Sequence, residues 1–157
     1  MPESISIRIN APPVRVCAKL WIGGPAVDPD AVSALLGMMP TKSHKSGDPR
    51  SNPKFLYKTG LWLLESDKTT DEGLLIDRFE WLLQKIEGKR AELAQLRAQG
   101  FDVHIVCRFD TRYWNTVIDL SPDLLARLSA LSLPLVFDIY SELDEDEDGV
   151  FDGDDDQ

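Results

Sequence analysis

The sequence predicts an α+β domain built as a two-layer sandwich. We expect a mixed or mostly antiparallel sheet of about four to five strands, with about three helices on one face. In several short segments apolar residues alternate with polar ones, as in strands with one buried face. Two segments open with a capping residue followed by Pro-Asp, which is typical of helix starts. A third segment, about residues 71–99, has an apolar stripe at helical spacing.

The N-terminal third predicts a strand followed by a helix. Residues 5–9 alternate, and residues 14–22 alternate again before Gly23-Gly24-Pro25 ends the second strand. Asp28 is placed to cap a helix that begins with Pro29-Asp30 and stops at Gly37. The apolar face of this helix consists of Val32, Leu35 and Leu36.

Residues 38–60 show no periodicity and carry several prolines and glycines. Such a long connection inside a compact domain is usually functional or mobile, so we expect a mobile loop. A short strand at 61–64 follows. The helical segment 71–99 comes next, with Gly88 weakening its middle and Gly100 ending it.

The C-terminal third repeats the strand and helix signals. Residues 101–109 alternate, and Ser121-Pro122-Asp123 opens a helix that Pro134 ends. Residues 135–139 then alternate as a final strand, with Leu135, Phe137 and Ile139 on its apolar side. The helix is expected to turn four leucines inward, Leu124, Leu125, Leu128 and Leu131.

Charge divides the 157 residues into two parts. Residues 142–157 contain ten acids and no lysine or arginine, and they account for the net charge of -10. We therefore predict a single domain at 1–141 and an acidic, disordered C-terminal tail at 142–157. The neutral domain argues against binding of duplex nucleic acid, which needs a concentrated basic face.

The sequence also indicates a compartment. Cys17 and Cys107 lie in alternating segments and are expected to be buried thiols, with no spacing typical of zinc sites. No apolar run approaches the ~20 residues of a membrane helix, so no membrane partner is expected. The start Met1-Pro2-Glu3-Ser4 lacks the pattern of a secretory signal, which predicts a cytoplasmic protein.

Several motifs occur in an order that resembles a bacterial family, domain of unknown function 4279. They are Asp28-Pro29-Asp30 with Leu35-Leu36-Gly37, the run 40–48, Gly60-Leu61-Trp62, Glu80-Trp81-Leu82-Leu83, and the stretch from Leu120-Ser121-Pro122-Asp123 to Phe137-Asp138-Ile139-Tyr140. The resemblance covers about residues 14–141. It implies an α+β domain and supplies no catalytic residue.

The run 42–58 is the first candidate site. Five basic residues face one acid there, and serines and a glycine lie among them, as in loops that wrap an anion. The alternatives are a solvated surface loop, a site for an anionic ligand or acidic partner surface, and a contact with the acidic tail. The candidate residues are Lys42, Ser43, His44, Lys45, Gly47, Asp48 and Arg50.

The acidic tail is the second candidate site. Its spacing resembles an EF-hand loop and, more closely, the aspartate-rich calcium repeats of thrombospondin type 3. Asp155 stands where a longer glutamate is usual, and no flanking helix is predicted, so a plain acidic tail is the alternative. The calcium ligands would be Asp144, Asp146, Asp148, the Val150 carbonyl, Asp152 and Asp155.

No phosphate loop, dinucleotide fingerprint, nucleophile elbow or zinc-protease helix is present, so no catalytic residue or obligatory cofactor is predicted. The leading hypothesis is a non-enzymatic cytosolic interaction domain that binds another protein. In its immunity-type form, the chain covers the basic surface of a toxin or nuclease. A calcium-binding module through the tail is the main alternative, and a small-molecule enzyme using the loop 38–60 is a weaker one.

Overall fold

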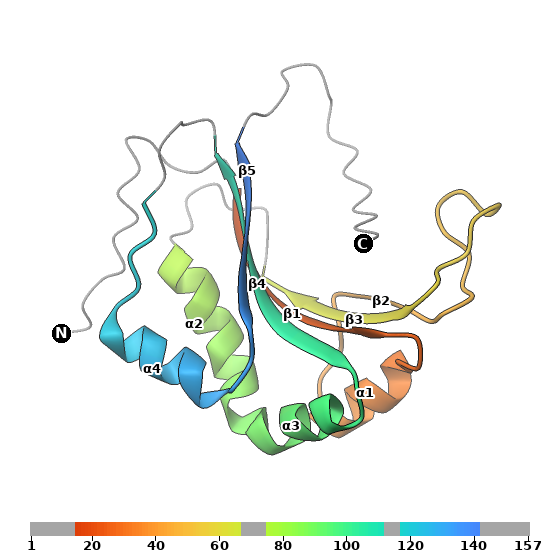
Figure 1. Ribbon diagram of the computed structural model, residues 1–157, viewed down its shortest axis with the longest axis horizontal. Helices are drawn as coiled ribbons and strands as arrows, with labels where there is room; N and C mark the ends of the chain where they lie inside the picture. Colours follow the sequence, from red (N-terminus) through yellow and green to blue (C-terminus); the bar gives the residue numbers. More distant parts are fainter. Residues whose placement is uncertain (1–14, 67–74, 112–116, 142–157) are drawn as a thin grey trace.

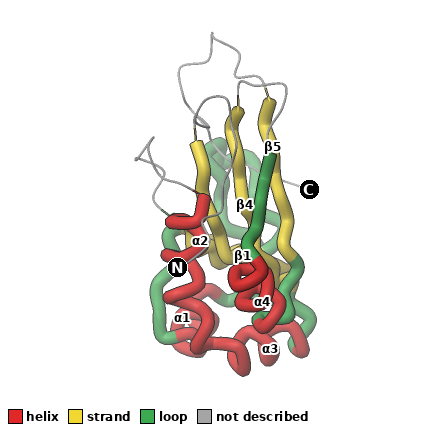
Figure 2. The backbone as a smooth tube through the Cα atoms, turned by 90° about the vertical axis from the view of Figure 1, so that its left-hand side faces the viewer, coloured by secondary structure: helices red, strands yellow, loops and turns green. Residues whose placement is uncertain are grey.

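The computed structural model describes residues 15–66, 75–111 and 117–141 (Figure 1). These residues form a two-layer α+β sandwich, with a mixed five-stranded sheet in the order β2-β3-β1-β4-β5. Figure 2 shows the helices gathered against the lower part of the sheet, while β4 and β5 continue above them. The predicted fold class is confirmed. The strands are β1 (Arg15–Gly24), β2 (Lys42–His44), β3 (Gly60–Glu65), β4 (Asp102–Thr111) and β5 (Leu135–Ser141), and the helices are α1 (Pro29–Leu36), α2 (Leu75–Ile86), α3 (Arg90–Ala98) and α4 (Pro122–Ala130).

The sheet is mixed because one of its connections is a helical crossover. β1 lies in the centre and pairs antiparallel with β3 and with β4, and β2 pairs antiparallel with β3. β4 and β5 are parallel, and α4 connects them. Parallel neighbours need such a crossover, whereas antiparallel neighbours can be joined by a hairpin.

The predicted helix starts are confirmed at atomic level. Asp28 accepts a hydrogen bond from the Asp30 amide at 3.2 Å, and Ser121 Oγ accepts one from the Leu124 amide at 3.2 Å. Each cap satisfies an amide that has no partner within the helix. Gly37 ends α1 with φ 68°, a left-handed conformation that glycine adopts without strain.

The long helical segment is two helices rather than one. A 3₁₀ turn, Glu87–Lys89, separates α2 from α3 and contains Gly88, the position predicted to weaken the helix. The apolar stripe continues across this turn, so both helices bury the same side. Its buried members are Phe79, Leu82, Ile86, Leu93 and Leu96.

The core lies between the helices and one face of the sheet. Ala18, Leu20 and Ile22 of β1 are fully buried there, as their alternation predicted. The other strands contribute Trp62, Leu64, Val103, Ile105, Cys107 and Phe109.

Two residues predicted to lie on apolar faces are about half exposed. Leu125 was expected to face inward but is 48 % exposed. The buried stripe of α4 follows the spacing of Leu124, Leu128 and Leu131, and Leu125 is turned about 100° from Leu124 around the helix. Ile139 lies on the helix side of β5, as predicted, but is 49 % exposed because β5 is the edge strand.

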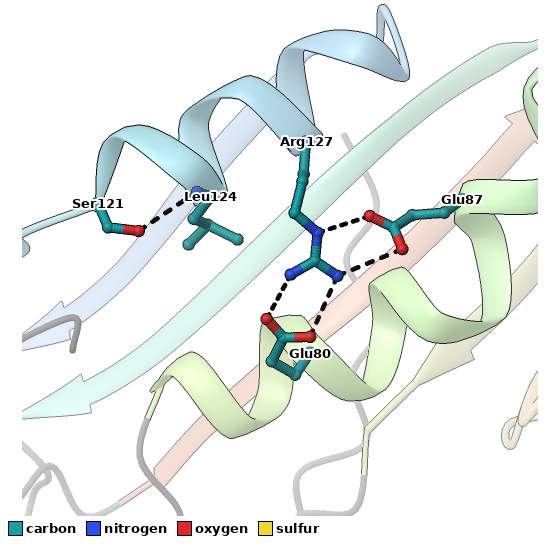
Figure 3. Close-up of polar contacts among 5 residues, drawn as sticks. All are labelled: Glu80, Glu87, Ser121, Leu124 and Arg127. Atoms are coloured by element: carbon teal, nitrogen blue, oxygen red, sulfur yellow. Dashed lines mark hydrogen bonds and ion pairs between the residues drawn. The ribbon is translucent and has the colours of Figure 1, made fainter. Parts of the chain in front are cut away.

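An arginine joins α4 to the rest of the helical layer (Figure 3). The Arg127 guanidinium donates to both oxygens of Glu87, at 2.7 and 3.2 Å, and to both oxygens of Glu80. These contacts raise the pKa of Arg127, and the hydrogen bonds from Arg127 lower the pKa of Glu87. Two bidentate ion pairs therefore hold α4, the helix that precedes β5, against α2 and the 3₁₀ turn.

Some predictions lie outside the described residues. These are the strand at 5–9 and the acidic tail with its calcium ligands. In the three described ranges, no helix is long and apolar enough to cross a membrane.

Candidate functional site

Residues 42–60 form a β-hairpin rather than an irregular loop. β2 pairs with β3, and beyond it Pro49 forms an isolated bridge with Leu56. The amide of Gly47 donates to the carbonyl of Tyr57 at 2.8 Å, and Tyr57 donates to Asp48 at 2.9 Å. Figure 1 shows this hairpin projecting beyond the helices and the sheet, so its tip is accessible.

The polar groups of the run 45–48 build this hairpin. The Lys45 amide donates to Asp48 Oδ2 at 2.7 Å, and the Asp48 amide donates to the Lys45 carbonyl at 3.2 Å. Ser46 Oγ donates to the carbonyl of Lys58 at 2.9 Å. Because these groups are engaged internally, an anion at the hairpin would meet side chains rather than the amides of Lys45, Gly47 and Asp48.

Lys45 ties the hairpin to the start of α1. Its Nζ lies 3.1 Å from Asp28 Oδ1 and 3.4 Å from Asp30 Oδ2. Hydrogen bonding to Asp28 raises the pKa of Lys45, and the same contact lowers the pKa of Asp28. Lys45 thus has a structural contact inside the chain, and its positive charge is largely balanced by two carboxylates.

Aromatic stacking organises the side of the hairpin next to β2. The rings of His44 and Tyr57 stack with centroids 3.5 Å apart, and the Arg50 guanidinium lies 5.3 Å from the Tyr57 centroid. Burial, together with the nearby charge of Lys42, lowers the pKa of His44. His44 is therefore neutral at pH 7, since its ordinary pKa is about 6.5.

The tip of the hairpin combines apolar and basic side chains. Phe55 is 60 % exposed and Leu56 is 56 % exposed, and Lys54 and Lys58 are exposed beside them. Large apolar side chains at a projecting turn contribute nothing to the core. They are typical of the centre of a protein interface, with charged residues at its rim. We call residues 54–58 the hairpin tip.

The sheet face turned away from the helices carries a second group of side chains, which we call the second face. Trp21 of β1 stacks on His104 of β4 with centroids 5.9 Å apart, and His104 Nδ1 lies 3.1 Å from Asp102 Oδ1. Gly23 makes room for this stack, because a Cβ there would lie 2.8 Å from Trp21 Nε1. The pairing register puts four residues in one row across this face: Lys42, Leu63, Trp21 and His104.

Charged side chains on the second face are paired across or along strands. Lys19 Nζ lies 3.7 Å from Glu65 Oε2 on the neighbouring strand. Arg108 Nε donates to Asp110 Oδ1 at 3.1 Å, and its guanidinium lies 4.0 Å from the ring centroid of Tyr140. Asp110 is only 1 % exposed, so its pairing compensates the cost of burying a carboxylate.

The two cysteines are buried thiols, as predicted. Cys107 lies on the core side of β4, and burial raises the pKa of its thiol well above the usual range. The thiol is therefore protonated at neutral pH. Within the described residues there is no cluster of three or more histidine, cysteine or acidic side chains able to hold a metal ion.

Two features of these surfaces were not predicted. The strand β2 was missed because the run 42–44, Lys-Ser-His, has no apolar alternation, and its pairing with β3 depends on residues 17 to 21 positions away. The side chain of His104 is only 18 % exposed, because its ring stacks on Trp21. The Trp21–His104 contact follows from the register of β1 with β4, which the sequence alone does not specify.

The comparisons with known proteins show the family of the chain and leave its activity open. No curated protein and no solved structure matches the chain. A family model described as "Domain of unknown function (DUF4279)" matches residues 13–142, which include every described helix and strand. The predicted resemblance is confirmed, and the chain belongs to this family.

Proposed function

We propose that the chain is a non-enzymatic protein-interaction domain of the bacterial cytoplasm, and that the hairpin tip is its main contact. The observation that carries this proposal is the exposure of Phe55 and Leu56, at 60 % and 56 %, on a hairpin that projects from the domain (Figure 1). Burial of apolar surface is the dominant favourable contribution to most protein–protein association.

The charge around the tip indicates the chemistry of the partner. Lys54 and Lys58 are exposed next to the apolar pair. Asp28 and Asp30 balance the charge of Lys45, so the positive charges of Lys54 and Lys58 remain at the tip. A partner surface with an apolar pocket and an acidic rim would complement this arrangement. Rim charges act mainly on the association rate, so complex formation is expected to slow as the salt concentration rises.

Other observations support a binding role over catalysis. The buried Cys107 is protonated at neutral pH and is a poor nucleophile. In the described part of the chain, the ring of His104 contacts Asp102 and Trp21, and neither of these is a nucleophile for a histidine base to activate. The reduced thiols fit a cytoplasmic location.

Site-specific photo-crosslinking in the native cell tests the proposal. A benzophenone amino acid at position 55 is expected to crosslink one defined protein. The matched control carries the same group at Leu125, which is 48 % exposed on α4 and lies far along the chain from the hairpin. Equal products from both positions, or none from position 55, would contradict the proposal.

Charge reversal then tests the partner chemistry. The double variant Lys54→Glu and Lys58→Glu is expected to bind the crosslinked partner more weakly at low salt, and to differ less from the unmodified chain at high salt. An unchanged association rate at low salt would remove the acidic rim from the proposal and leave the apolar contact.

The immunity-type form of the proposal makes a separate prediction. Here the partner is a toxin or nuclease, and the ten acids of residues 142–157 cover its basic surface. A chain that ends after Ser141 is expected to lose this binding, whereas the Lys54→Glu and Lys58→Glu variant retains it. Retention of binding by the shortened chain would exclude this form and keep the hairpin as the contact.

A further inference from the structure

The strand β5 ends the sheet with backbone groups directed outward. The Ile105 amide donates to the Pro134 carbonyl at 2.9 Å, and this bond sets the alternation of the parallel β4–β5 ladder. The N–H and C=O groups of even-numbered β5 residues therefore point toward β4. Those of Leu135, Phe137 and Ile139 point away from it, and within the described residues no further strand follows β5.

This edge lacks the features that usually prevent strands from pairing with other chains. β5 has seven residues in an uninterrupted register with β4, and it contains no lysine, arginine or internal proline. Its side chains are largely apolar and partly open, with Ile139 49 % and Val136 42 % exposed. A regular and largely apolar edge of this length, with Asp138 as its one charged side chain, is a surface for strand addition.

We infer that a second copy of this chain occupies the edge, with the two β5 strands antiparallel across a two-fold axis at Phe137. This register places Leu135 opposite Ile139 of the other copy and brings the two Phe137 side chains together. Every helix-side position then meets an apolar partner, and each of these pairs can exchange both of its N–H···O bonds.

The single acid of β5 argues against the alternative register with the axis one residue later. A two-fold axis at Asp138 would put two carboxylates directly opposite each other, which is destabilising. With the axis at Phe137, Asp138 faces Val136 of the other copy, and the Asp138 carboxylates lie on a diagonal. Arg108, the neighbour of Asp138 in the β4–β5 register, further offsets their repulsion.

Self-complementarity is the argument for a second copy over another partner. The same short strand supplies both sides of the interface, its apolar positions match one another, and its charge is accommodated in one register. A two-fold interface of this kind is closed, so association stops at the dimer and forms one continuous sheet. The proposal is independent of the hairpin tip, which lies beyond the opposite edge of the sheet.

Measurement of the mass of the full chain is the first test. Sedimentation of the unmodified protein over a wide concentration range is expected to show a monomer–dimer equilibrium. Ile139→Lys is expected to shift it at least tenfold toward monomer, because a lysine at the edge hinders pairing. The matched control Leu125→Lys changes a residue of equal exposure on α4 and is expected to leave the equilibrium unchanged.

Three outcomes of this experiment would overturn the inference. A monomer at every concentration would do so, and would leave an extended segment of another protein as the occupant of the edge. A dimer unaffected by Ile139→Lys, or one equally weakened by Leu125→Lys, would place the contact elsewhere. Thermal melting of both variants confirms that they are folded.

Disulfide formation tests the register. Opposed residues of a hydrogen-bonded antiparallel pair have Cα atoms about 5.5 Å apart, which suits a disulfide. Under mild oxidation, Phe137→Cys is therefore expected to form a covalent dimer and Asp138→Cys is not. If Phe137→Cys does not fold, mixing Leu135→Cys chains with Ile139→Cys chains tests the same register. A covalent dimer from Asp138→Cys alone would overturn it.

Discussion

The two edges of the sheet differ in how they are built and in what they offer to other molecules. The β2 edge has three residues, begins with Lys42, is followed by Lys45, and leads directly into a hairpin. The β5 edge has seven residues, no basic side chain and a straight register with β4. Short, charged edges discourage strand pairing, whereas long apolar ones permit it. In the two proposals above, one edge therefore offers side chains to a partner, and the other offers its backbone.

The ion pairs that join the two edges to the helices differ in their exposure and in their geometry. Lys45 contacts Asp28 and Asp30 through side chains that are 51 %, 53 % and 89 % exposed. On the β5 side, the Arg127 pairs involve side chains that are between 26 % and 36 % exposed, and both carboxylates are bidentate. Exposed lysine pairs contribute little to stability, whereas bidentate arginine pairs contribute more.

The part of the sheet next to the hairpin is stabilised by a buried tryptophan. Its substitution is expected to change the free energy of unfolding more than substitution of Arg127 or Lys45. Trp62 of β3 is fully buried, and its Nε1 donates to Ser33 Oγ of α1 at 2.9 Å. Trp62→Ala is expected to lower the free energy of unfolding by about 3–5 kcal/mol, because it leaves a large cavity. Urea unfolding followed by circular dichroism measures this change, and a loss below about 1 kcal/mol would show that Trp62 does not anchor this side.

On the β5 side, Arg127 is the corresponding anchor. Arg127→Met keeps much of the side-chain length but leaves Glu80 and Glu87 without their shared partner. We expect a loss of about 1–2 kcal/mol, since the pairs are partly exposed. Arg127→Lys should recover only part of it, because an ammonium cannot form two bidentate pairs. Full recovery in the lysine variant would mean that charge alone matters.

Low pH tests the contribution of Arg127 to stability, because protonation of its carboxylate partners removes the ion pairs. The pKa of Glu87 is lowered from its ordinary value of 4.5 by hydrogen bonding to Arg127. A carboxyl with a lowered folded-state pKa stabilises the protein above its unfolded pKa, and this stability is lost as the pH falls through the folded value. The difference between the unmodified chain and Arg127→Met should therefore shrink below about pH 4.5. A difference that stays constant in urea unfolding down to about pH 3 would contradict this linkage.

The two edges also differ in how well the sequence predicts them. The apolar alternation of residues 135–139 predicts β5, and Ser121-Pro122-Asp123 predicts the helix before it, because local periodicity and capping act within a few residues. β2 depends on pairing with residues of β3 that lie 17 to 21 positions later, and has no local pattern of its own. Long-range pairing therefore explains why the hairpin was expected to be an irregular loop.

The candidate site shows the same limit. The seven residues named from sequence do lie together at β2 and the adjoining turn, but most of their backbone groups build the hairpin. Phe55 and Leu56, which carry the proposed contact, were not singled out. Their exposure follows from the tertiary position of the tip, since apolar residues in a sequence are more often buried.

Loss of the exposed Lys45 contact is expected to change stability much less than the substitutions of Trp62 and Arg127. Lys45→Ala removes both contacts with α1 but leaves the hairpin hydrogen bonds in place. We expect the melting temperature to change by no more than about 2 °C, as for other surface substitutions. A drop similar to that of Arg127→Met would show that the β2 edge depends on its ion pair after all.

The smallest predicted effect is a local response of the hairpin to pH. Burial beside Tyr57 and the charge of Lys42 lower the pKa of His44, so the folded hairpin favours the neutral ring. A histidine with a lowered folded-state pKa stabilises the structure above its unfolded pKa of about 6.5, and this contribution is lost as the pH falls from there toward the folded value. Amide exchange at Tyr57, whose N–H bonds Asp48, should therefore speed up between about pH 7 and pH 5, after correction for intrinsic rates.

His44→Gln is the matched control for this response, because glutamine is polar, similar in size and does not titrate in this range. Its corrected exchange at Tyr57 should not change with pH, while β5, at the other edge of the sheet, should be insensitive in both proteins. If the variant and the unmodified chain respond alike, another group controls the hairpin. If amide exchange in β5 depends on pH as strongly as exchange at Tyr57, the two edges of the sheet open together rather than independently.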